Sequence, residues 1–360
     1  MYDWNEKIER VKTAIIGGET DRPPFTIMAA EQMICRVMGC TIPDLYNSPE
    51  FWAKATVKTQ EFFGSDIPYV ALDPALITAE AFGAKFIHRQ YLTSTATPED
   101  RLLKTPEDVD KLEIPDHRKA GLYPTLIQAF KYLREITHSP MIENFFFSDL
   151  TWGPIQQLRG EQAWTDFYLN PDLLPKLAEK IYQSNLSFLD VWKEEMGGTP
   201  LIDVNISYLG NKDMASYKDF WELEGKWVNK FRRKTGMGIV MHNCGRKPYW
   251  DQMIKDCRLL GVQPTFDSFG NSDVNYWKEM KKKHKIYIIG TLNQTGPTLT
   301  GTPQDVEKEV IDNLRALTPG GKFILTHGCE VGWGVPLENL LAVKTGVEKF
   351  SLMKGEEIHE

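Results

Sequence analysis

The chain has 360 residues, a net charge of −7 and a pI of about 5.6. This acidic balance gives no basic footprint for nucleic acid, so that partner class is disfavoured. The charged N-terminus has no apolar signal-peptide core, and no run of 18 apolar residues occurs. We therefore expect a cytoplasmic protein with no membrane span. Five cysteines are too few, and odd in number, for a disulfide framework.

Short apolar runs alternate with helical patterns along most of the chain, which predicts βα units and a parallel sheet. Helical spacing is clear in Val306, Val310 and Leu314. No Gly-x-Gly-x-x-Gly follows any of the runs, so a (β/α)8 barrel is favoured over a dinucleotide-binding fold. The predicted strands lie within 139–147, 199–207, 238–242, 261–267, 285–291 and 322–328.

The region from about 66 to 123 is less regular and rich in proline and charge. We interpret it as an N-terminal insertion over one end of the barrel. The chain contains no linker long enough to separate two independent domains. The sequence therefore predicts an α/β protein with a single TIM-barrel domain over 1–360.

Candidate metal ligands follow three of the predicted strands. His242 and Cys244 end one run, Asp267 ends the next, and Cys329 with Glu330 ends the last. Reactive groups in barrels sit at the carboxyl ends of strands, and thiolates with imidazole describe a zinc site. A catalytic Cys–His pair is the alternative, but it leaves one cysteine unused. Cys35, Cys40 and Cys257 are interpreted as packing residues.

Five blocks of the chain resemble the uroporphyrinogen decarboxylase superfamily, and together they span nearly its whole length. They are 80–86, 103–116, 152–160, 301–310 and 328–343. The resemblance implies a (β/α)8 barrel and one of two activities. The decarboxylase branch binds a polycarboxylate through an arginine-rich N-terminal motif. Here only Arg22 and Arg36 occur in that stretch, so the decarboxylase reading is weak.

The second branch contains zinc methyltransferases that work with a corrinoid (cobalamin) protein, and its hallmark is His-x-Cys followed by a distant cysteine. His242, Cys244 and Cys329 look like this hallmark. The resemblance therefore implies that these three residues hold Zn²⁺. A glutamate can supply a fourth ligand in this branch, whereas this sequence has Asp267. We assign catalytic roles to Asp267 and Glu330, the latter as a group that orients the ligands.

Aromatic residues near the expected mouth predict a substrate pocket formed by Phe147, Trp152, Tyr249 and Trp250. Such a pocket would suit a methoxylated aromatic, so O-demethylation is favoured over methyl transfer to a thiol such as coenzyme M. No Asp-x-His-x-x-Gly motif for cobalamin occurs, so the corrinoid is expected on a separate partner protein. A metal-free decarboxylase and a binding protein that has lost its chemistry remain the other hypotheses.

Overall fold

The computed structural model describes residues 2–68, 73–92, 94, 100–139, 145–265 and 273–357. Its centre is a parallel sheet with the strand order β1-β2-β3-β4-β5-β6. The strands are β1 Phe145–Ser148, β2 Ile202–Ile206, β3 Gly238–Asn243, β4 Gly261–Pro264, β5 Tyr287–Leu292 and β6 Phe323–His327. Each lies in or overlaps one of the runs predicted from the sequence.

Two extended segments continue the sheet beyond β6. Phe25 and Ala29 form parallel bridges to Leu325 and Val331. The next segment follows directly, because the Asp66 N–H donates to the Phe25 carbonyl at 2.8 Å. Together with the six strands, these two segments form the wall of the barrel, in agreement with the predicted (β/α)8 fold class.

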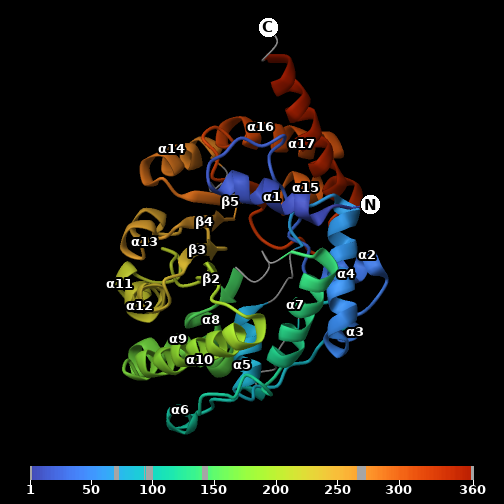
Figure 1. The fold of residues 1–360 in the computed structure, drawn as a ribbon. Coiled ribbons are helices and arrows are strands. Elements are labelled where there is room, and N and C mark those ends of the chain that lie inside the picture. The colour runs from blue at the N-terminus through green and yellow to red at the C-terminus, as the bar shows by residue number, and fades with distance from the viewer. Residues whose placement is uncertain are drawn as a thin grey trace.

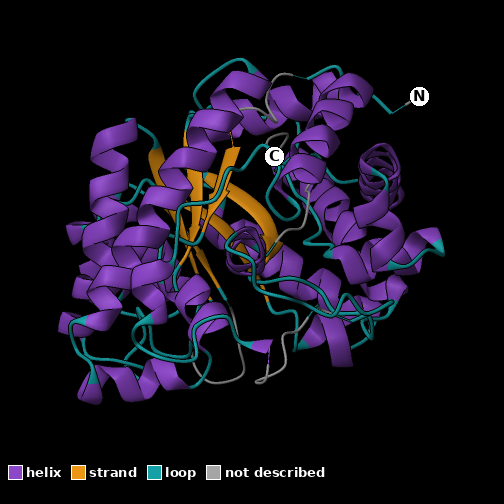
Figure 2. Ribbon diagram, turned by 90° about the horizontal axis from the view of Figure 1, so that it is seen from below, coloured by secondary structure: helices purple, strands orange, loops and turns teal. Residues whose placement is uncertain are grey.

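Helices surround the strands on the outside (Figures 1 and 2). Those before β2 are α1 Trp4–Ile15, α2 Glu31–Met38, α3 Ile42–Asn47, α4 Pro49–Phe63, α5 Pro74–Ala81, α6 Asp108–Lys111, α7 Tyr123–Thr137, α8 Trp152–Arg159, α9 Gln162–Leu169 and α10 Leu173–Met196. Those after β2 are α11 Tyr217–Phe220, the π-helix η3 Trp221–Gly225, α12 Lys226–Thr235, α13 Trp250–Asp256, α14 Val274–His284, α15 Pro297–Thr300, α16 Pro303–Leu317 and α17 Leu337–Glu357. None of the described helices is both long and apolar enough to cross a membrane.

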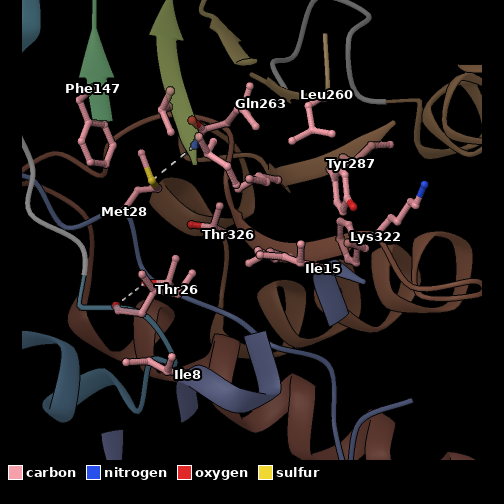
Figure 3. A pocket seen from close by; sticks show the side chains of 18 of the residues that line it. Ile8, Ile15, Thr26, Met28, Phe147, Leu260, Gln263, Tyr287, Lys322 and Thr326 are labelled. Atoms are coloured by element: carbon pink, nitrogen blue, oxygen red, sulfur yellow. Dashed lines mark hydrogen bonds between the residues drawn. The ribbon is translucent and has the colours of Figure 1, made fainter. Parts of the chain in front are cut away.

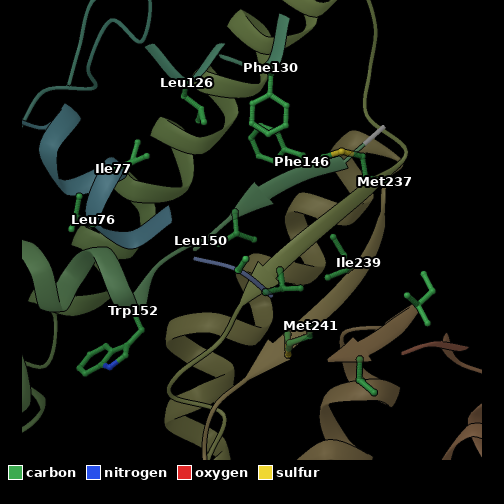
Figure 4. Packing of buried hydrophobic residues seen from close by; sticks show 14 of the residues in the cluster. Leu76, Ile77, Leu126, Phe130, Phe146, Leu150, Trp152, Met237, Ile239 and Met241 are labelled. Atoms are coloured by element: carbon green, nitrogen blue, oxygen red, sulfur yellow. The ribbon is translucent and has the colours of Figure 1, made fainter. Parts of the chain in front are cut away.

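Side chains of the strands alternate between the barrel interior and the helix layer. On β1, Phe146 is fully buried and contacts the rings of Phe188 and Trp192 of α10, outside the sheet. Figure 4 shows part of this outer core, where Phe146 lies beside Phe130 of α7. Burying one such ring contributes roughly 1.5–3 kcal/mol. The neighbouring Phe147 lines the barrel interior instead.

The helix α16 illustrates how the sequence sets these outer elements. The Asp305 N–H donates to Thr302 Oγ1, and the Thr302 N–H donates to the Asp305 carboxylate at 2.8 Å. This capping box, with Pro303 in the first turn, begins the helix. The predicted apolar positions Val306, Val310 and Leu314 are all buried.

The predicted insertion, 66–123, begins inside the barrel wall. Ile67 and Pro68 line the interior together with the strands. The helix α5 then starts at Pro74, where Asp73 accepts hydrogen bonds from two N–H groups of the first turn. Farther along, the described residues form the short helix α6 and loops.

Candidate metal centre

The structure brings His242, Cys244 and Cys329 together at the carboxyl ends of two strands. His242 lies in β3 and Cys244 directly follows it, while Cys329 comes two residues after the end of β6. All strands of the sheet run parallel, so their carboxyl ends meet at one end of the barrel. Residues 85 positions apart in the chain therefore share one site.

The potential ligand atoms of these three residues lie within 4.8 Å of one another. His242 Nε2 is 2.6 Å from Cys244 Sγ, which is 3.5 Å from Cys329 Sγ. Zinc binds imidazole nitrogen and thiolate sulfur at about 2.0–2.3 Å, so one ion can reach all three atoms. His242 is buried, Cys329 is half-buried and Cys244 is exposed, which leaves the site open to ligands on one side.

The loop after β3 is shaped by a close approach between two residues. Gly245 lies against the Asn211 side chain, where a Cβ atom on residue 245 would come within 1.5 Å of the amide nitrogen. The Gly245 N–H donates to Asn243 Oδ1 at 2.7 Å, which turns the chain just after Cys244. A residue larger than glycine does not fit at position 245 unless Asn211 moves.

The pKa values of the Cys244 and Cys329 thiols shift in opposite directions. The hydrogen bond from Cys244 lowers the pKa of the Cys329 thiol well below its usual range, and His242 adds to this effect. The same hydrogen bond raises the pKa of Cys244. A lowered pKa favours the thiolate, which is the form of a cysteine that binds metals.

Four buried or half-buried carboxyl groups surround this end of the barrel. Burial raises the pKa of Glu31 to about 7, and it raises those of Asp73 and Asp149. Burial and the charge of Glu31 raise the pKa of the half-buried Glu330 in the same way. Glu31 also accepts a hydrogen bond from the Tyr46 hydroxyl at 3.1 Å.

Sequence reasoning selected only Glu330 from this group. Asp149 directly follows β1, and Glu31 follows the wall segment that contains Phe25 and Ala29. The rule that selected Cys244 and Cys329, a reactive residue just past a strand, applies equally to these two carboxylates.

The aromatic residues predicted to form a pocket are placed differently from one another. Trp152 is fully buried and contacts Trp164 of α9, while Trp250 packs edge-to-face on Trp277 of α14. Tyr249 is half-buried, and its hydroxyl donates to the Ala215 carbonyl at 2.9 Å. Phe147 faces the barrel interior. Asp267, the predicted catalytic residue, lies outside the described residues.

A cavity of about 110 Å³ lies inside the barrel (Figure 3). Its walls are mainly apolar side chains of the strands, and Ile8 and Ile15 of α1 lie on one side of it. Gln263 donates to Met28 Sδ at 3.4 Å and pairs in register with His242. His242 therefore stands in the same layer of the barrel as this polar pair.

Comparison with known proteins identifies the family. The model of the uroporphyrinogen decarboxylase (URO-D) family matches residues 6–350. The chain belongs to this family. A search of curated proteins found no match to this uroporphyrinogen decarboxylase family member.

Two solved structures resemble this member of the uroporphyrinogen decarboxylase family. A methyltransferase from Methanosarcina mazei matches with a TM-score of 0.77 and 19% identity, over 95% of this chain and 98% of that one. A B12-independent methionine synthase from Shewanella sp. W3-18-1, solved with selenomethionine, has a TM-score of 0.49 and 12% identity, over 88% and 91%. At its level of identity, the first match supports the fold.

Proposed function

We propose that this protein is a zinc-dependent methyltransferase. It would move a methyl group between a small methylated molecule, in the first instance a methoxylated aromatic, and the cobalt of a corrinoid on a separate protein. The observation that carries the proposal is the convergence of His242, Cys244 and Cys329. The fold that the chain shares with a methyltransferase supports it.

The three side chains suit a zinc ion better than a harder cation, because two are sulfur donors and one is imidazole. A zinc ion bound there supplies Lewis-acid chemistry to the heteroatom that carries the methyl group. His242 and the two cysteines would hold the ion and leave one position for substrate, which is the pattern of a catalytic site. We assign the remaining catalytic contacts to Asp267 and Glu330.

The decarboxylase alternative is disfavoured by the pairing of Arg22. Its guanidinium donates to both carboxylate oxygens of the fully buried Asp66, at 2.7 Å each. Arg36, the other arginine in that stretch, donates to the carbonyls of Trp333 and Val335. Both guanidinium groups are thus engaged with protein groups rather than with a polycarboxylate substrate.

The nature of the methyl donor depends on the side chains at the open end. Trp152 and Trp250 are packed between helices, so we do not include them in the proposed pocket. Phe147 and Tyr249 remain as the aromatic contacts for a methoxylated ring. Transfer in the opposite direction, from methyl-cobalt to a thiol such as coenzyme M, is the alternative for the same metal site.

Metal analysis and methyl transfer test the proposal together. We expect about one zinc per chain in the wild type and loss of zinc in Cys244→Ala and Cys329→Ala. Cys40→Ala is the matched control, since Cys40 is half-buried and distant in sequence from the metal ligands. Full zinc in either ligand variant would refute the metal assignment.

The activity assay mixes the protein with cobalt(I) corrinoid and a panel of methyl donors. Methylation of cobalt by methoxylated aromatics, faster than methyl transfer from methyl-cobalt to coenzyme M, supports O-demethylation. Turnover of the thiol alone would reverse the proposed direction. Stoichiometric cobalamin bound tightly to the purified chain would contradict a separate corrinoid protein.

A further inference from the structure

Tyr208 lies two residues after the end of β2, the strand that pairs with β3 and its His242. Ile206 pairs in register with His242, and the Ser207 N–H donates to the His242 carbonyl at 2.9 Å. The extensions of β2 and β3 are therefore still paired at Ser207, directly before Tyr208. Tyr208 is half-buried and packs against the hydrophobic core.

The loop that starts with Tyr208 is bound to the loop that carries Cys244. The Tyr249 N–H donates to the Gly210 carbonyl at 3.0 Å, and the Lys212 N–H donates to the Lys247 carbonyl at 3.0 Å. The Lys247 N–H donates to Asn211 Oδ1 at 3.1 Å. These bonds hold the two loops side by side, so Tyr208 and Cys244 keep a fixed relation.

The buried carboxylate of Glu224 binds the residues on both sides of Tyr208, through the side chain of Ser207 and the backbone of Leu209. Glu224 Oε2 accepts hydrogen bonds from Ser207 Oγ at 2.6 Å and from the Leu209 N–H at 3.0 Å. Glu224 lies in the π-helix η3, a type of helix found frequently at functional sites. It is 3% exposed, so solvent does not compete for these bonds.

Burial and nearby negative charges, including those of Cys244 and Cys329, raise the pKa of the Tyr208 phenol. Burial raises its pKa, and the negative charges of Asp73, Asp149, Cys244 and Cys329 raise it further. Among the described residues, none accepts a hydrogen bond from this hydroxyl. The hydroxyl is thus a free hydrogen-bond donor on the loop that is bonded to the loop carrying Cys244.

From this arrangement we propose that Tyr208 is a further catalytic residue, which donates a hydrogen bond to the oxygen from which the methyl group leaves. This role rests on the proposed methyl transfer. Glu224 is the positioning residue, because it binds the residues on either side of Tyr208.

The step needs no further reactant. The carbon–oxygen bond of the donor breaks, and its electron pair stays on the oxygen. Reduced cobalt of the corrinoid supplies the pair for the new carbon–cobalt bond and is oxidised from cobalt(I) to cobalt(III). Tyr208 keeps its proton while its hydrogen bond strengthens as the oxygen becomes negative, and solvent later protonates the product. A donor aimed at developing charge favours the transition state over the ground state.

The test compares Tyr208→Phe with the wild type and with Tyr217→Phe. Tyr217 is a matched control, because its hydroxyl is bonded to Asp256 at 2.6 Å. We expect all three to contain the same zinc, and Tyr208→Phe to lower kcat about 10- to 100-fold. The loss should grow as the leaving phenol becomes more basic, a trend that a purely structural effect would not produce.

A binding measurement separates this role from activity. 4-Nitrophenol carries the leaving oxygen without a methyl group, and its absorption reports binding. We expect Tyr208→Phe to bind it about 10-fold more weakly than the wild type in the zinc-loaded protein, and Tyr217→Phe to bind it normally.

The two measurements distinguish the two proposals. If no variant transfers methyl groups but Tyr208→Phe still loses nitrophenol affinity, the proposed function fails and the hydrogen bond stands. Equal nitrophenol affinity in Tyr208→Phe and wild type overturns the role of Tyr208, whether or not methyl transfer occurs. A ratio of wild-type to Tyr208→Phe rates that stays constant across the donor series overturns it as well.

Discussion

The amide nitrogen of Asn211 lies 1.5 Å from the point where a Cβ atom on residue 245 would stand. Gly245→Ala must therefore displace Asn211, which accepts the Lys247 N–H and so joins the loops after β2 and β3. We expect zinc affinity to fall at least about 10-fold, because Cys244 is the preceding residue. Competition with a chelator measures this change. Gly198→Ala is the control, since its added methyl group meets open space, and equal zinc affinity in both variants would contradict the prediction.

Asp66 is expected to be among the most sensitive positions for stability. It is fully buried and pairs with Arg22 and with Arg10 at 2.8 Å. Asp66→Asn leaves Arg22 without a carboxylate and leaves Arg10 with only Asp21 and Glu6, which costs about 3–5 kcal/mol of unfolding free energy. Urea titration measures this loss. The exposed pair of Lys54 and Glu50 provides the control, because Lys54→Ala should change stability by less than about 1 kcal/mol.

His117 should make the protein less stable in mild acid. Burial lowers its pKa from 6.5 to about 4, so the native state keeps the ring neutral. The unfolded chain binds a proton below about pH 6.5, so this contribution is complete above that pH and is lost as the pH falls towards 4. From pH 7 to 5 the loss is about 2 kcal/mol.

The variant His117→Gln isolates this contribution from the buried carboxyl groups, whose raised pKa values act with the opposite sign. Its amide can still bond Ser184 and Ser187, the partners of the imidazole. The unfolding free energy of the wild type minus that of the variant should fall by about 2 kcal/mol between pH 7 and pH 5. A difference that is independent of pH would disprove this account.

The roles assigned to His242 and Asp267 predict different losses. His242→Ala removes one of three converging ligands and should abolish zinc binding. Asp267→Ala should keep zinc and change only the rate of methyl transfer, because three ligands remain. Elemental analysis and rate measurements on the same preparations compare them. Zinc loss in Asp267→Ala would make that residue a ligand.

The strands were predictable because each is a short, continuous apolar run followed by a turn, as in Gly238–Asn243 and Phe323–His327. The convergence of His242, Cys244 and Cys329 was predictable for a related reason: they lie at or just after the ends of such runs. Trp152 and Trp250 show the limit of this rule. Each begins a helix directly after a strand or loop, and the turn of that helix directs the ring into the packing between helices. Proximity in sequence to a strand end does not fix the direction of a side chain.

Other features could not be predicted because they depend on contacts between distant segments. The wall segment at Phe25 and Ala29 is recognised only by its bridges to Leu325 and Val331. Tyr208 has no distinguishing pattern in the sequence, because its position depends on Glu224 of η3, which binds Ser207 and Leu209. A local sequence pattern does not predict which carboxylate will bind a given loop.

The void inside the barrel makes the protein sensitive to pressure. Its roughly 110 Å³ are bounded mainly by hydrocarbon, so water gains little by entering while the chain is folded. Unfolding removes this space and shrinks the system by tens of millilitres per mole. Compression should therefore unfold this barrel more readily than a barrel of the same size with a filled interior. Val204 and Val240 both line this cavity, so replacing either with a larger residue should raise the pressure needed to unfold the protein.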